Sequence, residues 1–206
     1  MLKVLGRITS INVRKVLWLA DEIGVGYERE DWGKPNRDPN VPEFLALNPN
    51  ATVPVVIDDG FVLWESQPVM RYLATKHDSA LWPTELHERA RVDQWMSWQS
   101  TELNPAWSYP MWALLRKRPG YDDPEKIAQG IREWNAKMQM IETQIGKSGG
   151  FVANGRFSLA DIVVALSTHR YAMTPFDKPS FPALEAHYAQ MQSRPAGKPW
   201  LGAMTP

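Results

Sequence analysis

Strand-forming patterns are confined to the first part of this chain, and this asymmetry constrains its fold more than any other feature. Short apolar segments that fit strands occur at residues 2–6, 25–31, 53–58 and 61–64. Between and after them the apolar residues fall at helical spacing, so residues 1–77 follow the order strand, helix, strand, helix, strand, strand, helix. Beyond residue 86 the sequence holds no convincing strand pattern.

This order predicts a mixed sheet followed by a helical domain. A strand–helix–strand segment implies a parallel pair with a crossover helix, and the "DDG" turn implies an antiparallel hairpin. We therefore expect a four-stranded mixed sheet with packed helices over residues 1–78 and an all-helical domain over residues 86–206, with a linker between them. The expected fold class is α/β followed by all-α.

The helical half carries clear start signals. Asp123 is placed to cap a helix with Pro124 at its first position, and isoleucine, tryptophan and methionine then recur at steps of three and four up to residue 145. Ser158 and Asp161 form the S-x-x-D pattern of a capping box. Pro105 and Pro110 are expected to bend or interrupt the helix that begins near residue 85.

Composition narrows the possible functions. The 206 residues include 23 basic and 23 acidic ones, so there is no basic footprint for nucleic acid. Without cysteine the chain has neither a disulfide framework nor a cysteine nucleophile. The four histidines lack metal-ligand spacing, and we expect no metal site. We also expect no membrane span, no signal peptide and a cytoplasmic location.

Tryptophan is abundant, and its clustering has two interpretations. Ten tryptophans are present, and five of them lie between residues 95 and 134. They can form a helical core, since aromatic residues dominate cores, or they can line a pocket for hydrophobic ligands. The two interpretations can hold for different members of the set.

The turn before the first helix also has two interpretations. Ser10 and Asn12 place a hydroxyl and an amide where that helix begins. Such side chains commonly cap a helix, and they can equally hold a ligand. The turn alone leaves both open.

Four stretches, taken together, resemble one known family. They are "TSINVRKVLWLADEIGVGYE", "LNPNATVPVVIDDGFVLWES", "ERARVDQWMSWQ" and "FSLADIVV", and they occur in the order and spacing of cytosolic glutathione S-transferases. The chain is most similar to theta- or beta-like bacterial members of the serine or asparagine type. The resemblance implies a thioredoxin-like first domain and an all-helical second domain.

The resemblance assigns a catalytic role to the first turn. Ser10 falls where serine-type members place the hydroxyl that activates the thiol of glutathione, and Asn12 is its rival for this role. A free thiol is mostly protonated at neutral pH, while the thiolate is the nucleophile. A donor to the sulfur, aided by the start of a helix, favours the thiolate.

The resemblance also implies a set of glutathione-binding residues. Pro54 would follow a cis peptide bond that presents the backbone of Val53 to the ligand, and Glu65 with Ser66 would hold the γ-glutamyl end. Some relatives carry a lysine where this chain has Thr52, and we expect Lys34 or Arg37 to replace it. The binding residues expected from the resemblance are Ser10, Asn12, Arg37, Val53, Pro54, Glu65 and Ser66.

The expected function is glutathione transfer to a small hydrophobic electrophile, as in detoxification, with glutathione as co-substrate and no metal. The electrophile is expected near an aromatic segment interrupted by proline, at Trp107, Tyr109, Met111 and Trp112. A homodimer is implied by the resemblance. The alternatives are peroxide or disulfide reduction, isomerisation or dehalogenation with glutathione at the same site, or a non-catalytic interaction protein on this fold.

Overall fold

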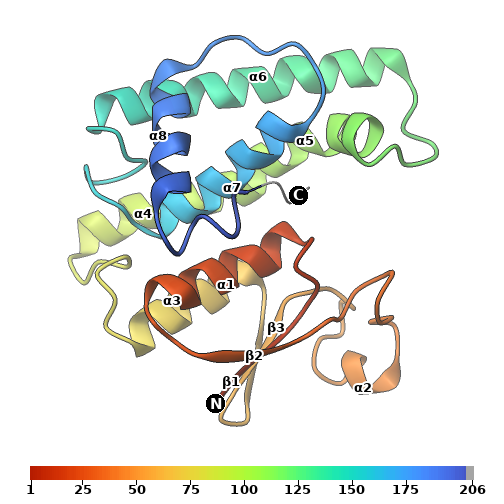
Figure 1. The fold of residues 1–206 in the computed structure, drawn as a ribbon, viewed down its shortest axis with the longest axis vertical. Coiled ribbons are helices and arrows are strands. Elements are labelled where there is room, and N and C mark those ends of the chain that lie inside the picture. Colours follow the sequence, from red (N-terminus) through yellow and green to blue (C-terminus); the bar gives the residue numbers. More distant parts are fainter. Residues whose placement is uncertain (203–206) are drawn as a thin grey trace. The chain divides into compact units, whose positions relative to one another are not determined.

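A computed structural model describes residues 1–202 of the chain. Its backbone divides into two compact units, the first spanning Met1–Trp82 and the second beginning at Pro83 (Figure 1). No helix among the described residues is long and apolar enough to cross a membrane.

The first unit is built on a four-stranded mixed sheet, as predicted. Its elements are β1 (Leu2–Leu5), α1 (Ile11–Glu22), β2 (Tyr27–Glu30), α2 (Pro42–Leu45), β3 (Val55–Asp58), β4 (Phe61–Trp64) and α3 (Ser66–Lys76). The strand order is β2-β1-β3-β4, with β1 parallel to β2 and antiparallel to β3. Helices α1 and α3 lie together on one face of the sheet (Figure 1).

The β3–β4 hairpin forms as its sequence predicts. The two strands pair antiparallel, with Val55 opposite Trp64 and Asp58 opposite Phe61. The connecting Asp59 and Gly60 both have positive φ, at 49° and 89°. Aspartate followed by glycine adopts this backbone readily and matches the twist of the strands.

The second unit contains helices and no strand among its described residues. Its elements are α4 (Leu86–Trp98), η1 (Gln99–Leu103), α5 (Asn104–Pro110), η2 (Met111–Leu115), α6 (Pro124–Lys147), α7 (Leu159–Met173) and α8 (Pro182–Ser193), where η denotes a π-helical segment. Helix α7 is the core of this unit, since every side chain from Leu159 to Tyr171 is buried. Together the two units confirm the expected fold class.

The α-helix is interrupted near Pro105 and Pro110, as predicted, and the interruptions are π-helical segments rather than loops. The chain stays helical from Leu86 to Leu115, and π-helical segments lie before Pro105 and after Pro110. Proline has no backbone N–H and cannot make the usual hydrogen bond to the carbonyl four residues earlier. In a π turn that bonding pattern is already changed, so the missing N–H disrupts the helix less. The ring of Pro110 fits against α6 because Gly130 has no side chain; a Cβ there would lie 2.6 Å from Pro110 Cδ.

Both predicted helix starts are confirmed. The Asp123 carboxylate accepts hydrogen bonds from the backbone N–H groups of Glu125 and Lys126 at the start of α6. At the start of α7, Ser158 and Asp161 form the reciprocal capping box. These caps satisfy backbone donors that a helix start leaves without partners.

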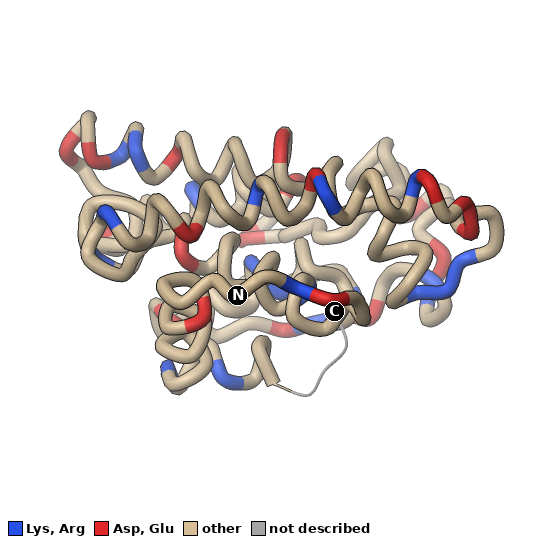
Figure 2. Tube along the Cα trace, turned by 90° about the horizontal axis from the view of Figure 1, so that it is seen from above, with Lys and Arg blue, Asp and Glu red and all other residues tan. Residues whose placement is uncertain are grey.

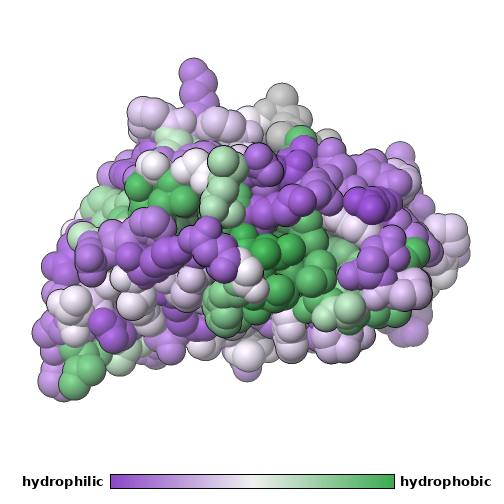
Figure 3. All heavy atoms as spheres, turned by 90° about the horizontal axis from the view of Figure 1, so that it is seen from below, coloured by the Kyte–Doolittle hydropathy of each residue, from purple (hydrophilic) through white to green (hydrophobic). Residues whose placement is uncertain are grey.

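Charged residues are dispersed over the described chain (Figure 2), whereas apolar side chains gather on one face (Figure 3). Figure 2 shows basic and acidic residues interspersed along the trace of residues 1–202, without a basic stripe. Figure 3 shows one face on which hydrophobic side chains gather among hydrophilic ones. The large apolar side chains most open to solvent come from both units and include Met1, Phe61, Leu86 and Met140.

Candidate functional site

The turn between β1 and α1 leaves the hydroxyl of Ser10 uncommitted. Ser10 is the N-cap residue of α1, with an extended backbone at φ −85° and ψ 123°, and its side chain makes no capping hydrogen bond. Backbone bonds close the turn instead: Ser10 N–H donates to the carbonyl of Arg7 at 3.1 Å, and Arg14 N–H donates to the carbonyl of Ser10 at 3.0 Å. The hydroxyl is therefore available to a ligand.

Asn12 lies in the first turn of α1, and the oxygen of its side-chain amide is held by a hydrogen bond. The Nζ of Lys15 donates to its Oδ1 at 3.1 Å. Asn12 is half-buried, and among residues 1–202 its Nδ2 makes no hydrogen bond. Both N–H groups of that amide are therefore available as donors.

The start of α1 is unusually positive. Its first turn contains no acidic residue, while Arg14 and Lys15 are 0% and 1% exposed. Arg14 Nε donates to the carbonyl of Ile8 at 2.7 Å, which fixes that guanidinium beside the turn. A helix N-terminus already carries a partial positive charge, so this end of α1 favours an anion.

The loop before β3 presents Val53 outside the sheet. The Val53–Pro54 peptide is cis, as expected from the resemblance, and a second cis bond, which was not predicted, precedes Pro35. Among the described residues, the backbone N–H and C=O of Val53 have no hydrogen-bond partner. An extended peptide can pair with such groups in the manner of an added strand.

Asn48 holds this loop in shape, a role that its sequence context did not predict. Its side chain is 1% exposed. Its Nδ2 donates to the carbonyl of Thr52 at 2.9 Å, and its Oδ1 accepts from Asn50 N–H at 3.0 Å. Asparagine side chains commonly stabilise turns by hydrogen bonding to nearby backbone, so the residue type at position 48 could have indicated this role.

Gly6 brings the first turn and this loop together. A Cβ on Gly6 would lie 2.4 Å from Val13 Cγ2 on α1 and 3.3 Å from Val53 Cβ in the loop. The first distance is shorter than any normal carbon–carbon contact, so a side chain does not fit here. The missing side chain of Gly6 lets α1 and Val53 pack closely on the end of β1.

The start of α3 forms the third part of the site. Glu65 is the N-cap residue of α3 and has φ 69° with ψ 117°, a conformation that costs energy for any residue with a side chain. Its carboxylate is exposed and makes no capping bond. Ser66, which follows it, is 4% exposed, and its hydroxyl has no partner among residues 1–202.

Strand register sets this third part beside the second. Val55 pairs with Trp64 at the end of the hairpin. The loop that carries Val53 and the start of α3, which follows Trp64, therefore lie at the same end of this hairpin. The first unit carries Ser10 and Asn12 at the start of α1, Val53 in the loop before β3, and Glu65 and Ser66 at the start of α3.

Arg37, the basic residue of the predicted set, has partners within its own part of the first unit. Its guanidinium lies over the ring of Trp32 at 3.7 Å and donates to Glu30 at 3.3 Å. Lys34 pairs with Asp38 at 3.3 Å. A hydrogen bond from Lys3, then one from Trp32, lowers the pKa of Glu30, so this carboxylate stays ionised beside Arg37.

Both the carbonyl and the hydroxyl of Thr52 accept hydrogen bonds within its own loop. Its carbonyl accepts a hydrogen bond from Asn48 at 2.9 Å, and its hydroxyl accepts one at 3.2 Å. Thr52 therefore serves the loop rather than replacing the lysine of some relatives.

The four aromatic-segment residues of the second unit lie on two sides of their helix. Trp107 and Met111 are buried, and the indole N–H of Trp107 donates to Asn104 Oδ1 at 3.0 Å. Tyr109 and Trp112 are half-buried, with ring centroids 5.0 Å and 6.3 Å from that of Tyr121. Among the clustered tryptophans Trp107 and Trp134 are core residues, while Trp95, Trp98 and Trp112 are half-buried.

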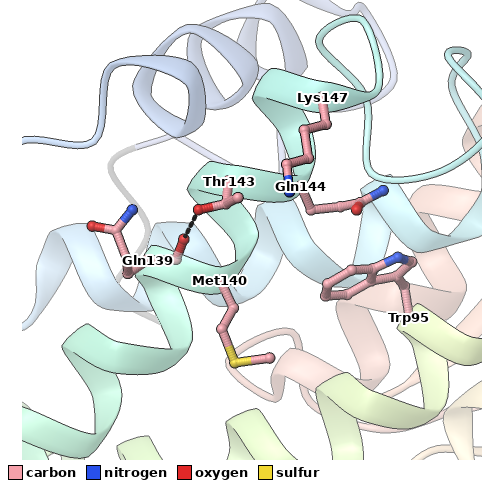
Figure 4. A pocket seen from close by; sticks show the side chains of 6 residues that line it. All are labelled: Trp95, Gln139, Met140, Thr143, Gln144 and Lys147. Carbon is pink, nitrogen blue, oxygen red and sulfur yellow. Dashed lines mark hydrogen bonds between the residues drawn. The ribbon is translucent and has the colours of Figure 1, made fainter.

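The second unit also has a surface groove between α4 and α6 (Figure 4). Its volume is about 310 Å³, and its lining is Trp95, Gln139, Met140, Thr143, Gln144 and Lys147. Figure 4 shows five of these side chains arising from successive turns of α6 and Trp95 facing them from α4. None of the four predicted electrophile residues lines this groove.

Comparison with known proteins identifies the family. Residues 9–76 match the family model of the glutathione S-transferase N-terminal domain, and residues 106–195 match that of the C-terminal domain. The glutathione S-transferase GstB of Escherichia coli K12 is 30% identical over 199 residues, which cover 95% of each chain. No group of histidine, cysteine or acidic residues that could hold a metal occurs within residues 1–202.

Solved structures agree with this. The theta class glutathione S-transferase of Xanthomonas axonopodis pv. citri, solved with glutathione bound, superimposes with a TM-score of 0.90 at 30% identity, covering 100% of this chain and 99% of that one. A glutathione S-transferase of Pseudomonas fluorescens gives a TM-score of 0.87 at 26% identity, covering 98% and 99%. The chain belongs to the glutathione S-transferase family.

Proposed function

We propose that this chain binds glutathione on its first unit, ionises the thiol at the start of α1 and transfers the sulfur to a hydrophobic electrophile. One observation carries the proposal: the turn before α1 offers uncommitted donors on Ser10 and Asn12 beside two buried cations. In a capping turn the side-chain oxygen of Ser10 would accept a hydrogen bond from a backbone N–H of the helix, and it does not do so here. Both donors are available to a ligand that is, or becomes, an anion.

The energies required are within reach of this turn. A free thiol has a pKa of about 8.5, so only about 3% is ionised at pH 7. Lowering the pKa by about 2 units would ionise most of it and corresponds to about 2.7 kcal/mol. A hydrogen bond to a charged group contributes about 1.5–3 kcal/mol, and a helix start adds about 0.3–1 kcal/mol.

The remaining residues of the site anchor the peptide. The free backbone groups of Val53, after which Pro54 follows in cis, pair with the cysteinyl part of glutathione. The Ser66 hydroxyl and the first N–H groups of α3 receive the α-carboxylate of the γ-glutamyl end, and Glu65 receives its ammonium. Arg37, with Lys34 as the alternative, approaches the glycine carboxylate.

The division of labour between the units follows the family. Residues 1–78 bind glutathione, and residues 86–206 supply the surface for the electrophile. Tyr109 and Trp112 are the better candidates of the aromatic set because they are half-buried, whereas Trp107 and Met111 are buried. The protein acts as a homodimer in the cytoplasm, and sedimentation velocity would test the dimer.

The first experiment is a pH titration of the protein–glutathione complex, following thiolate absorbance. The wild-type complex should show a thiol pKa well below that of free glutathione, and either Ser10→Ala or Asn12→Ala should abolish the shift. Ser100→Ala is the matched control, because its hydroxyl is exposed on the second unit. Binding with an unshifted thiol, or no binding at all, would refute the proposal.

A further inference from the structure

We infer that Lys15 is a positioning residue that orients the amide of Asn12, so that Asn12, rather than Ser10, is the donor to the sulfur of glutathione. This inference rests on the proposed function. It adds a residue that does not itself contact the sulfur and chooses between the two candidate donors.

The placement of Lys15 runs against local physical preference. It lies in the second turn of α1 and is 1% exposed, although a lysine is rarely buried without a specific partner. A cation near a helix N-terminus also opposes the helix dipole. A locally disfavoured residue in a well-packed element commonly marks a functional position.

The helix geometry makes Asn12 a natural partner. Residues three apart on a helix are neighbours on one face, and Lys15 Nζ is 3.1 Å from Asn12 Oδ1. Because an ammonium has only donors, the Asn12 atom that faces Lys15 must be the oxygen. The NH₂ group of the same planar amide therefore points away from Lys15.

This contact fixes which end of the amide a ligand meets. Asn12 is half-buried and its NH₂ has no hydrogen-bond partner among residues 1–202. Without Lys15 the amide could rotate and present its oxygen, which would repel a thiolate. A donor that is already oriented stabilises the developing charge without reorganisation. The hydroxyl of Ser10, in contrast, makes no capping bond that would orient it.

A double-mutant cycle tests the inference, with the pKa of bound glutathione thiol as the readout. Lys15→Met should raise this pKa by about 1 unit, a tenfold change in the ratio of thiolate to thiol. Asn12→Ala should raise it at least as much, and adding Lys15→Met to Asn12→Ala should have little further effect. Lys147→Met, which removes an exposed lysine of the second unit, should leave the pKa unchanged.

Two further variants keep the test decisive if Lys15→Met fails to fold. Lys15→Arg keeps a donor-only cation and should retain most of the shift. Asn12→Asp keeps the oxygen that accepts from Lys15 and loses the NH₂ group, so it should abolish the shift.

Several results would overturn the inference. One is an equal effect of Lys15→Met with and without Asn12, which would mean that Lys15 acts through its charge alone. Another is an intact shift in Asn12→Asp or Asn12→Ala, with loss in Ser10→Ala. An unshifted thiol in the wild-type complex would instead refute the proposed function, so the two failures are distinguishable.

Discussion

Gly6 is the residue on which the geometry of the site depends most directly. A methyl group there would overlap Val13 on α1 and press on Val53. We expect Gly6→Ala to destabilise the protein by about 1–3 kcal/mol, the usual cost of overpacking, and to weaken glutathione binding by displacing Val53. Urea unfolding and calorimetric titration with glutathione would measure the two effects.

Another glycine of the same unit provides the control. Gly26 has no heavy atom within 4 Å of the position of an added Cβ, and its φ is not positive. Gly26→Ala should leave both stability and glutathione affinity close to wild type. Equal behaviour of the two variants would show that Gly6 is not a packing constraint.

At this scale the sequence predicted backbone features better than side-chain partners. The cis bond before Pro54 was predicted from the resemblance to a family, and the cap at Asp123 from its position directly before Pro124. The role of Asn48 and the positive φ of Glu65 were not. Both depend on how neighbouring loops and helix starts pack in three dimensions, and the spacing of residues in the sequence does not reveal this.

Among the elements, α7 depends on a single buried carboxylate. Asp161 accepts hydrogen bonds from the N–H groups of Val152 and Ser158, both at 2.8 Å, and contacts His187 Nε2 of α8 at 3.0 Å. Asp161→Ala would leave these groups buried without partners, and we expect a loss of about 3–5 kcal/mol in the free energy of unfolding. The measurement is chemical denaturation.

The exposed cap of α6 gives the comparison. Asp123 also accepts from two backbone N–H groups, at 3.0 Å and 3.2 Å, and its side chain is 42% exposed. Asp123→Ala should therefore cost only about 1 kcal/mol. If both variants lost the same amount, burial of Asp161 would not be the source of its importance.

The end of β3 should make the first unit sensitive to acid. Asp58 accepts hydrogen bonds from Lys76 at 2.5 Å and Tyr72 at 2.7 Å, and these lower its pKa. A lowered pKa in the folded state means that stability is present above the unfolded pKa, near 3.9, and is lost as the pH falls through the folded value.

A variant isolates this contribution. Asp58→Asn should be less stable than wild type at pH 7, and the difference should shrink as the pH is lowered from about 5. Thermal unfolding midpoints between pH 7 and 3 would measure it. Asp78→Asn, at an exposed position of the same unit, should follow the wild-type curve; a constant difference for Asp58→Asn at all pH values would contradict the assignment.

Element boundaries were predictable to within a few residues, and helix type was not. The apolar spacing that ends at Ile145 predicted α6, where Trp134, Met138 and Ile141 are buried. The π-helical segments near Pro105 and Pro110 carry no period of their own. Buried residues occur in both segments and in α5 between them, so their placement depends on packing that no local spacing reveals.

For the whole molecule, glutathione should act as a stabilising ligand. A ligand that binds only the folded state at one hundred times its Kd adds about 2.7 kcal/mol. For a chain of this size we expect a rise in Tm of about 5–10 °C. Differential scanning fluorimetry would measure it, with Ser66→Ala showing a smaller rise at the same glutathione concentration. No rise in the wild type would mean that the folded state does not bind glutathione.

The order of strand and helix patterns was enough to predict the architecture of each unit. Parallel and antiparallel pairing followed from connection length, as in β1 with β2 and β3 with β4. The expected grouping of Ser10, Val53 and Ser66 rests on the resemblance to a family and stays a prediction, because these residues are far apart in sequence and no local pattern links them.

The two π-helical segments have a consequence for how chains of this kind can differ in length. Each π turn contains one residue more than an α turn. Deletion of one residue within η1 or η2 would therefore leave an ordinary α turn. The side chains after the deletion would keep their directions. Elsewhere in α4 or α5 the same deletion would rotate all following positions by about 100°. Natural single-residue deletions among homologues should therefore be tolerated at these two places and excluded from the helical turns between them.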